Sequence, residues 1–496
     1  MSLPVTQRHG KALSPTGLRP LDAPAWIDGI DNPYLHGHFA PIGTELDVDA
    51  LEVEGELPRE LHGAYFRNGP NAVHAPTNRY HWFDGDGMVH GIWFEDGKAR
   101  YANRWVKTAG RDLEAERDGA VWPGVLGPFD FSLPMGPIKD TANTDLLAVG
   151  GRLLALWYES GKPYALNLRT LQTEGVEDFG GRLTFPLSAH SKTDPATGDF
   201  IFFSYGDKPP YMRYGVLRAD GTLHHVDIDL PGPRRPHDIG VTPNYSVLHD
   251  FPVFFDPALF KKTGKRIPLF HPDVPTRYGV IPRLGNNDDV RWFECEPCYM
   301  LHVVNCWEEG DWVVMVGCRT ADPSLRPDPA DGKIAAMLSG LKLQANLYRW
   351  RFNLKTGAVD EGPLDDYNAE FPMINPAVTG TSNRYAYLQH IPFEIPATFH
   401  GLVKYDLQSG AYTEFSYGTG VYGSEAPFAA RSGATEEDDG WLVSFVTDTN
   451  DWSSRCLVFD ARDVAAGPVA SVKLPQRVPA GFHATWVDGA TLGAAG

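Results

Sequence analysis

Four histidines lie in apolar, strand-like surroundings next to turn signals: His190 in LSAH, His237 in RPHD, His302 in YMLHVVN and His483 in AGFHATW. Neutral imidazole is a common ligand for transition metals, so four of them could hold one ion. They stand 47, 65 and 181 residues apart, which is much too far for a local motif such as HExxH. Taken singly, each is more often a core histidine with a satisfied hydrogen bond. A shared site therefore requires a fold in which distant segments meet.

A second histidine follows His237 closely. In RRPHDIGVTPNYSVLHD, His237 and His249 are each followed by aspartate and stand twelve positions apart. Metal-binding pairs with a local spacing are usually about two to five residues apart. Twelve is too far for one helical face and uninformative along a strand. The spacing alone leaves open whether either residue is a ligand.

Two shorter motifs invite a metal-binding interpretation that the rest of the chain does not support. Cys295 and Cys298 form one CEPC pair, whereas a structural zinc site usually needs a second pair. The run FDGDGMVH at 83–90 is rich in carboxylates, but Asp-Gly repeated between strands first indicates a tight hairpin rather than a calcium loop. No GxSxG or HExxH motif occurs, so serine hydrolases and zinc proteases lack support.

Short strands dominate the chain, and they are β-branched or aromatic and bounded by Gly, Pro, Asp or Asn. We expect strands at 152–159, 199–206, 311–318, 384–391, 401–407, 440–448 and 455–461. A strand–turn–strand pattern recurs at 164–176, 214–226, 348–362 and 402–415, as in the outer hairpins of β-propeller blades. Helices are expected only at 331–348, 256–262 and 461–467. The sequence thus predicts an all-β propeller with a few helices, in which the starts of the innermost strands meet on the axis.

Composition limits the partners and the compartment. Among 496 residues the formal net charge is −19, which argues against broad contact with nucleic acid because phosphate binding needs a surplus of Lys and Arg. No apolar segment is long enough for a signal peptide or a membrane span. The five cysteines are an odd number that fits a reducing cytosol. We expect a cytoplasmic protein, and no obligate protein partner is evident.

Nine segments, in order from about residue 45 to the C-terminus, resemble the carotenoid cleavage oxygenases. They are ELHGAYFRNGPN (60–71), HWFDGDGMVHG (81–91), TANTDLLAVGGRLLALWYESGKPYAL (141–166), PLSAHSKTDPATGD (186–199), PHDIGVTPNY (236–245), LHVVNCWEEG (301–310), AEFPMINP (369–376), EAPFAAR (425–431) and FHATW (482–486). The resemblance implies a seven-bladed β-propeller with non-haem Fe(II) on the axis, capped by a few helices and loops. It also implies an N-terminal extension, residues 1–44, followed by a single oxygenase domain, residues 45–496.

The resemblance also implies the site residues. The family's four iron ligands match His190, His237, His302 and His483, which leaves His249 as a structural residue. Four neutral imidazoles on octahedral Fe(II) leave two positions open for O₂ and for water or substrate. The three glutamates that orient the family's ligands match Glu159, Glu370 and Glu425, and Thr144 matches a threonine that crowds one open position.

The reaction implied by the resemblance adds both atoms of O₂ to a conjugated C=C bond of a hydrophobic alkene and gives two carbonyl products. Members that cleave hydroxystilbenes or phenylpropenes carry Lys directly before the first glutamate, where this chain has Tyr158 after Trp157. Lys139 belongs to a different segment and does not replace it. We therefore favour a carotenoid or apocarotenoid over a lignin-derived stilbene. A calcium-dependent propeller hydrolase or a binding module is a remote alternative, since it would want carboxylates at the axis.

A carotenoid substrate resides in a membrane, and the family commonly docks through an apolar patch. FPVFFDPALFKK (251–262) and the segment 331–348 mix apolar side chains with lysines and could form such a patch. Packing of both segments inside the protein is an equal alternative. The sequence predicts peripheral membrane contact at most.

Overall fold

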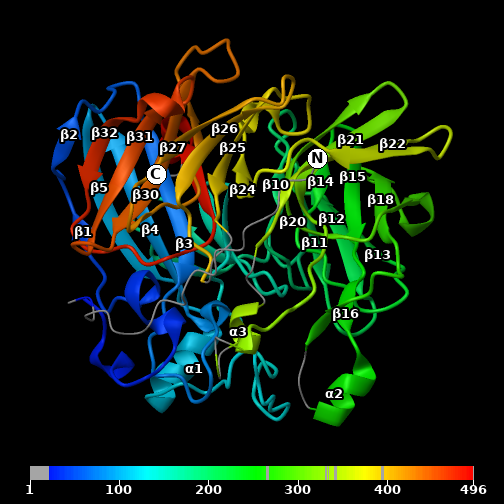
Figure 1. Ribbon diagram of the computed structural model, residues 1–496, viewed down its shortest axis with the longest axis horizontal. Helices are drawn as coiled ribbons and strands as arrows, with labels where there is room; N and C mark the ends of the chain where they lie inside the picture. Colours follow the sequence, from blue (N-terminus) through cyan, green and yellow to red (C-terminus); the bar gives the residue numbers. More distant parts are fainter. Residues whose placement is uncertain are drawn as a thin grey trace.

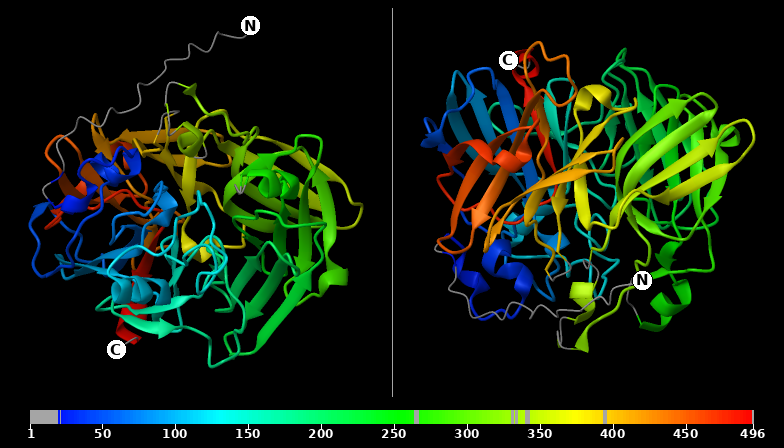
Figure 2. Two further views of the ribbon diagram at one scale, coloured as in Figure 1. Left: turned by 90° about the horizontal axis from the view of Figure 1, so that it is seen from below. Right: turned by 45° about the horizontal axis from the view of Figure 1, so that its top comes forward.

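The computed structural model describes residue 20 and residues 22–263, 267–329, 332, 335–339, 343–392 and 396–494. In this part of the chain seven antiparallel sheets form a ring, round which the colours of the sequence run in Figure 2, and two further strands form a separate hairpin. The predicted all-β, seven-bladed propeller is therefore confirmed. All seven strand regions expected from the sequence contain strands.

Five blades are built from strands in chain order, from the innermost strand to the rim. Blade 1 contains β6 (Asp145–Val149), β7 (Arg152–Leu156), β8 (Tyr164–Asn167) and β9 (Thr173–Val176). Blade 2 contains β10 (Lys192–Thr193), β11 (Phe200–Tyr205), β12 (Met212–Leu217) and β13 (Leu223–Ile228). Blade 3 contains β14 (Gly240–Val241), β15 (Tyr245–Asp250), β18 (Thr276–Pro282) and β19 (Arg291–Cys295). Blade 4 contains β20 (Tyr299–Glu309), β21 (Trp312–Thr320), β22 (Asn346–Asn353) and β23 (Val359–Pro363). Blade 5 contains β24 (Ala369–Met373), β25 (Tyr385–His390), β26 (Gly401–Asp406) and β27 (Tyr412–Ser416).

The last two blades join the two ends of the chain and so close the ring. Blade 6 contains β28 (Val421–Tyr422), β29 (Phe428–Ala430), β30 (Gly440–Asp448), β31 (Ser453–Asp460), β32 (Pro468–Lys473) and β2 (Val53–Gly55). Blade 7 contains β33 (Ala484–Asp488), β3 (Gly63–Pro70), β4 (Gly87–Glu95), β5 (Lys98–Trp105) and β1 (Asp47–Val48). An N-terminal strand thus completes blade 6, and the C-terminal strand β33 is the innermost strand of blade 7. Both pairings are antiparallel, with Arg67 opposite Ala484 and Val53 opposite Val472.

The four repeated strand–turn–strand segments are the outer hairpins of blades 1, 2, 4 and 5. In blade 4 the turn between β22 and β23 ends at Gly357, which has φ +81° and donates its N–H to the carbonyl of Asn353. A residue without Cβ suits this left-handed conformation. The strand–turn–strand pattern in the sequence therefore marks the rim of these four blades.

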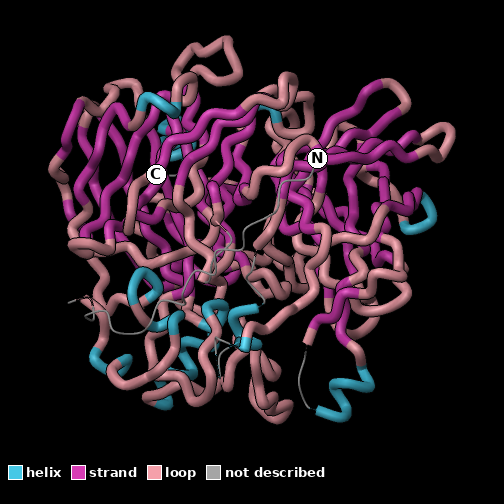
Figure 3. Tube along the Cα trace, viewed as in Figure 1, coloured by secondary structure: helices cyan, strands magenta, loops and turns pink. Residues whose placement is uncertain are grey.

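Loops and three of the α-helices, α1 (Ala109–Arg117), α2 (Pro257–Thr263) and α3 (Ala335–Leu338), lie at one end of the ring, the lower end in Figures 1 and 3. The other α-helix in the described residues, α4 (Gly489–Ala494), follows β33 and contacts blade 7. The 3₁₀ helices are Ala25–Ile27, Pro33–Leu35, Gly37–Phe39, Trp82–Asp84, Asn287–Asp289, Pro376–Val378 and Val464–Ala466. A hairpin of β16 (Val253–Phe255) and β17 (Pro268–Phe270) leads to and from α2. None of the helices in the described residues is long and apolar enough to span a bilayer.

The predicted helices are only partly correct. The helix expected at 256–262 is α2, and the one expected at 461–467 is a single 3₁₀ turn, Val464–Ala466. A continuous helix over 331–348 is wrong, because Asn346 already belongs to β22, whose partner is β21. Part of that segment lies outside the described residues. Pairing with a neighbouring strand outweighs the local helical periodicity at its C-terminal end.

Candidate metal centre

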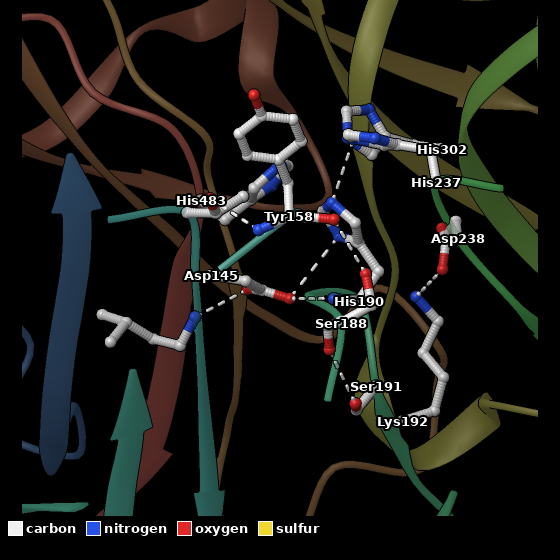
Figure 4. Close-up of polar contacts among 12 residues, drawn as sticks. Asp145, Tyr158, Ser188, His190, Ser191, Lys192, His237, Asp238, His302 and His483 are labelled. Atoms are coloured by element: carbon white, nitrogen blue, oxygen red, sulfur yellow. Dashed lines mark hydrogen bonds and ion pairs between the residues drawn. The ribbon is translucent and has the colours of Figure 1, made fainter. Parts of the chain in front are cut away.

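The four predicted histidines lie at the inner ends of four blades. His190 stands two residues before β10, His237 three residues before β14, and His483 directly before β33, while His302 is inside β20. Since the innermost strands surround the axis, the four side chains converge although they are far apart in the sequence (Figure 4). The fold supplies the proximity that the spacing of the residues could not.

The imidazoles are close enough to share one ion. The Nε2 atoms of His190 and His237 are 3.1 Å apart, and one ring nitrogen each of His190, His237 and His302 lie within 4.8 Å of one another. The ring centroid of His483 is 4.5 Å from that of His190 and 4.7 Å from that of His302. Two neighbouring octahedral ligands, each about 2.1 Å from a metal, would have nitrogens about 3 Å apart.

Two predicted glutamates hold two of these rings. Nδ1 of His302 lies 2.5 Å from Oε2 of Glu370, and Nδ1 of His483 lies 3.1 Å from Oε1 of Glu425. A β-bulge in β24 follows Glu370, with Phe371 at φ +56°, so the backbone departs from regular pleating where the carboxylate meets His302. A carboxylate on Nδ1 fixes the ring orientation and leaves Nε2 free for a metal.

Glu159 has a different environment. Its Oε2 accepts a hydrogen bond from Arg235 across 2.7 Å, and Arg235 also pairs with Asp207 at 3.2 Å. Arg235 stands only two residues before His237, so the first predicted glutamate is tied to the segment that carries this histidine. The sequence does not predict this role of Arg235, because an arginine in a loop carries no signal of its distant partner.

Thr144 lies in the strand segment that touches several site residues. Its carbonyl accepts from the N–H of His483, and its Oγ1 accepts from the N–H of Tyr158 at 3.2 Å. The same hydroxyl donates to Oδ1 of Asn143. Thr144 is thus fixed next to both His483 and the segment that leads to Glu159.

An ion pair between a half-buried lysine and a buried aspartate links three of the histidine-bearing segments. Nζ of Lys192 lies 2.6 Å from Oδ1 of Asp238, and Oδ2 of Asp238 accepts from the N–H of Val303 at 2.8 Å. These three residues directly or nearly follow His190, His237 and His302, and the ion pair is visible in Figure 4. The sequence alone does not predict this ion pair, because its two residues are 46 positions apart.

The electrostatics suit a cation at the centre. Burial lowers the pKa of His190, His237 and His302 well below the ordinary histidine value, so these rings are neutral. Burial also lowers the pKa of His483, but the carboxylates of Glu425, Asp145 and Glu370 together outweigh burial, and the net pKa is raised. Nε2 of His302 is buried without a hydrogen-bond partner among the described residues. Three neutral imidazoles and a fourth imidazole beside a carboxylate are a fitting donor set for a transition metal.

Aromatic rings border the histidines. The ring of Phe371 lies 4.9 Å from that of His302 and stacks at 5.0 Å on that of His483. Phe83 contacts Tyr158 at 5.0 Å and Phe482 at 5.3 Å. Their faces can shield the site from water and stabilise developing positive charge.

The structure shows what surrounds three residues that the sequence offers as alternative site residues, and none of them lies among the four histidines. His249 lies buried in β15, with its ring 5.4 Å from that of Tyr278 and neither nitrogen hydrogen-bonded to a described residue. Lys139 is buried in ion pairs with Asp86 and Glu114. Cys295 is a buried free thiol, as is its CEPC partner.

Comparisons with known proteins agree with this geometry. The family model described as retinal pigment epithelial membrane protein matches residues 39–488. A carotenoid 9,10(9′,10′)-cleavage dioxygenase of Crocus sativus is 39% identical over 92% of this chain and 89% of its own length. An isoeugenol monooxygenase of Pseudomonas nitroreducens is 30% identical over 92% of this chain and 98% of its own length.

Solved structures share the architecture. The lignostilbene dioxygenase of Pseudomonas brassicacearum superposes with a TM-score of 0.82 and 29% identity, covering 92% of this chain and 99% of that protein. A cobalt-substituted apocarotenoid oxygenase of Synechocystis gives 0.79 and 28%, covering 90% and 97%. That apocarotenoid oxygenase therefore holds cobalt. With the histidine cluster, the propeller and these matches in agreement, the chain belongs to the retinal pigment epithelial membrane protein family, that of the carotenoid cleavage oxygenases, and is an oxygenase.

Proposed function

We propose that this protein is an Fe(II)-dependent dioxygenase that cleaves a conjugated C=C bond of a carotenoid or apocarotenoid into two carbonyl products. The observation that carries the proposal is the convergence of His190, His237, His302 and His483 on the propeller axis, with Nδ1 of two rings on buried carboxylates. Four histidines on an octahedral ion would leave two positions open. Bound Fe(II) would supply the electron chemistry that activates O₂.

The chain's own residues would orient both reactants and exclude water. Phe371 and the cluster of Phe83, Tyr158 and Phe482 would fix an elongated apolar polyene beside the histidines. Thr144, held by its contacts to His483 and Tyr158, would narrow one side of the open space. One molecule of O₂ and one alkene give two carbonyl groups, so neither a reductant nor a proton donor is consumed.

The substrate class follows from what stands before Glu159. A lysine there could activate a phenol, but the chain has Tyr158, and Lys139 is committed to Asp86 and Glu114. The relative from Crocus sativus, 39% identical, is a carotenoid 9,10(9′,10′)-cleavage dioxygenase. These observations favour a carotenoid or apocarotenoid, cut at the 9,10 bond, over a hydroxystilbene.

Exposed apolar side chains at the capped end would dock on a membrane that holds such a substrate. Phe131 and Met135 are 68% and 57% exposed, and the ring of Phe131 lies 6.4 Å from that of Phe260 in α2. Lys261 and Lys262 follow in the same helix, both exposed. Apolar side chains beside lysines suit a peripheral contact with a lipid headgroup region. Segment 251–262 was expected there, whereas Phe131 and Met135 were not.

The decisive experiment offers iron-loaded protein a β-apocarotenal or carotenoid and a 4-hydroxystilbene, each under ¹⁸O₂. We expect two carbonyl fragments from the carotenoid, each carrying one ¹⁸O, and no hydroxybenzaldehyde. Hydroxybenzaldehydes alone would overturn the substrate class but not the iron site. His237→Ala should lose bound iron while His249→Ala keeps it; iron retained in both would contradict the ligand assignment.

A further inference from the structure

Asp145, the first residue of β6, contacts a predicted ligand that has no glutamate among its described contacts. Its Oδ2 accepts a hydrogen bond from the backbone N–H of His190 at 3.0 Å and lies 3.5 Å from Nδ1 of the same residue (Figure 4). Oδ1 accepts from the N–H of Leu146 at 2.7 Å, which fixes the carboxylate in place. Both oxygens are therefore committed, one of them to His190.

His190 needs such a contact because its backbone is strained. It has φ +62°, a left-handed conformation that residues other than glycine rarely adopt. The surrounding turn is held from both sides: the N–H of Ala189 donates to the carbonyl of Trp157, and that of Ser188 to the carbonyl of Phe203. Strain of this kind persists where neighbours over-determine it and concentrates at functional sites. Here the result is that Nε2 of His190 faces Nε2 of His237 at 3.1 Å.

Asp145 differs from two other carboxylates near the four histidines in how its negative charge is offset. The charge of Glu159 is offset by Arg235, and that of Asp238 by Lys192. Asp145, by contrast, forms no ion pair with a lysine or arginine in the described part of the chain, and its one recorded ion-pair contact is His190. The negative charge of Asp145 can therefore act on the imidazole of His190 and on a metal ion bound to that ring.

We propose that Asp145 is a positioning residue of the metal centre: it fixes the strained backbone of His190 and supplies the carboxylate charge beside that ring. The inference rests on the proposed iron site and goes beyond the three glutamates implied by the family resemblance. A carboxylate against a ligating imidazole orients the ring and raises its basicity. Asp145 directly follows Thr144 in the sequence, so two residues beside the histidines come from the beginning of β6 and the position before it.

Two substitutions separate the two roles. Asn in Asp145→Asn can still accept the N–H of His190 but carries no charge, whereas Asp145→Ala loses both. We expect Asp145→Ala to bind Fe(II) or Co(II) about 10- to 100-fold more weakly, measured by competition with a chromophoric chelator. Asp145→Asn should fall between Asp145→Ala and the wild type in affinity. It should also raise the Fe(III)/Fe(II) midpoint potential, because a negative charge next to the metal favours the ferric form.

Asp194 provides the matched control. It is a buried aspartate four residues after His190, but it pairs with Arg283 at 3.0 Å and contacts none of the four histidines. Asp194→Asn should lower the melting temperature and leave metal affinity, potential and the Co(II) absorption spectrum unchanged. Equal weakening of metal binding in Asp194→Asn and Asp145→Ala would overturn the proposal, as would wild-type affinity and potential in both Asp145 variants. If the wild-type protein itself binds no metal ion, the proposed function fails rather than this inference.

Discussion

Nη1 of Arg235 lies 2.7 Å from Oε2 of Glu159, and the two side chains are only 10% and 12% exposed. The guanidinium also stacks over the ring of Phe255 at 4.2 Å. A buried ion pair contributes little net stability as a pair, but removing one partner leaves the other charge buried and uncompensated. The position of the segment before His237 therefore depends on the ion pair between Arg235 and Glu159.

Arg235→Met should destabilise the protein by about 3–5 kcal/mol, because Glu159 is left charged and nearly buried. Urea unfolding monitored by tryptophan fluorescence measures this loss. The double variant Glu159→Gln/Arg235→Met removes both charges and should recover most of it. A loss below about 1 kcal/mol in the single variant, typical of an exposed pair, would contradict this account.

Arg283→Met is the matched control variant for the measurement of metal affinity. Its partner is Asp194, and both side chains are 10% exposed, so the cost in stability should be similar. Arg283 touches no residue of the centre, and its loss should leave metal affinity unchanged. Arg235→Met should weaken metal binding as well, because Arg235 stands two residues before His237 and its ion pair with Glu159 holds that segment in place.

Glu370→Gln should weaken Fe(II) or Co(II) binding about 10- to 100-fold. The present carboxylate accepts both from Nδ1 of His302 and from the N–H of Phe371 with the same oxygen, Oε2. A neutral amide lacks the charge that raises the basicity of the imidazole. Chelator competition measures the change.

Glu308→Gln is the comparison for that variant. Glu308 lies on the same strand as His302 but accepts from Thr242 and Asn244 at the blade surface. Its substitution should leave metal binding as in the wild type. The same affinity for Glu370→Gln and wild type would show that His302 is oriented without this carboxylate.

His249→Phe should make the protein more resistant to acid. Burial lowers the pKa of His249 from 6.5 to about 3, so between pH 6.5 and pH 3 the unfolded chain binds a proton that the folded chain excludes. Stability is therefore lost as pH falls through this window, by about 2 kcal/mol at pH 5. Phenylalanine does not titrate, so the melting temperature of the variant should exceed that of the wild type increasingly from pH 7 to pH 5.

The exposed His225 provides the reference. His225→Phe should follow the pH dependence of the wild type, since folding does not take this ring out of water. A difference between His249→Phe and wild type that is constant with pH would mean that packing alone, and not the excluded proton, separates them.

The strands and the site differ in how far the sequence predicts them. The sequence predicts the outer hairpins because turn residues such as Gly357 recur between apolar runs, which is a local property of the chain. The histidines and glutamates came from a family resemblance, since only the closed ring brings His190 and His237 together. Asp145 and Arg235 gave no signal, because each acts on a residue 45 or 76 positions away across packed blades. The left-handed backbone of His190 likewise depends on contacts with neighbouring strands.

Replacing the exposed apolar pair in Phe131→Asp/Met135→Asp should detach the protein from membranes. Burial of one such side chain contributes about 2 kcal/mol, so loss of both should weaken binding to lipid vesicles at least about tenfold. Cosedimentation with vesicles measures this. Val469→Asp is the control: this residue is 42% exposed, but on the outer strand β32 of blade 6 rather than beside α2. Cleavage of detergent-dispersed substrate should be unchanged in both variants, and that of vesicle-embedded substrate should fall only in the first. Undiminished vesicle binding by Phe131→Asp/Met135→Asp would assign membrane contact to another face.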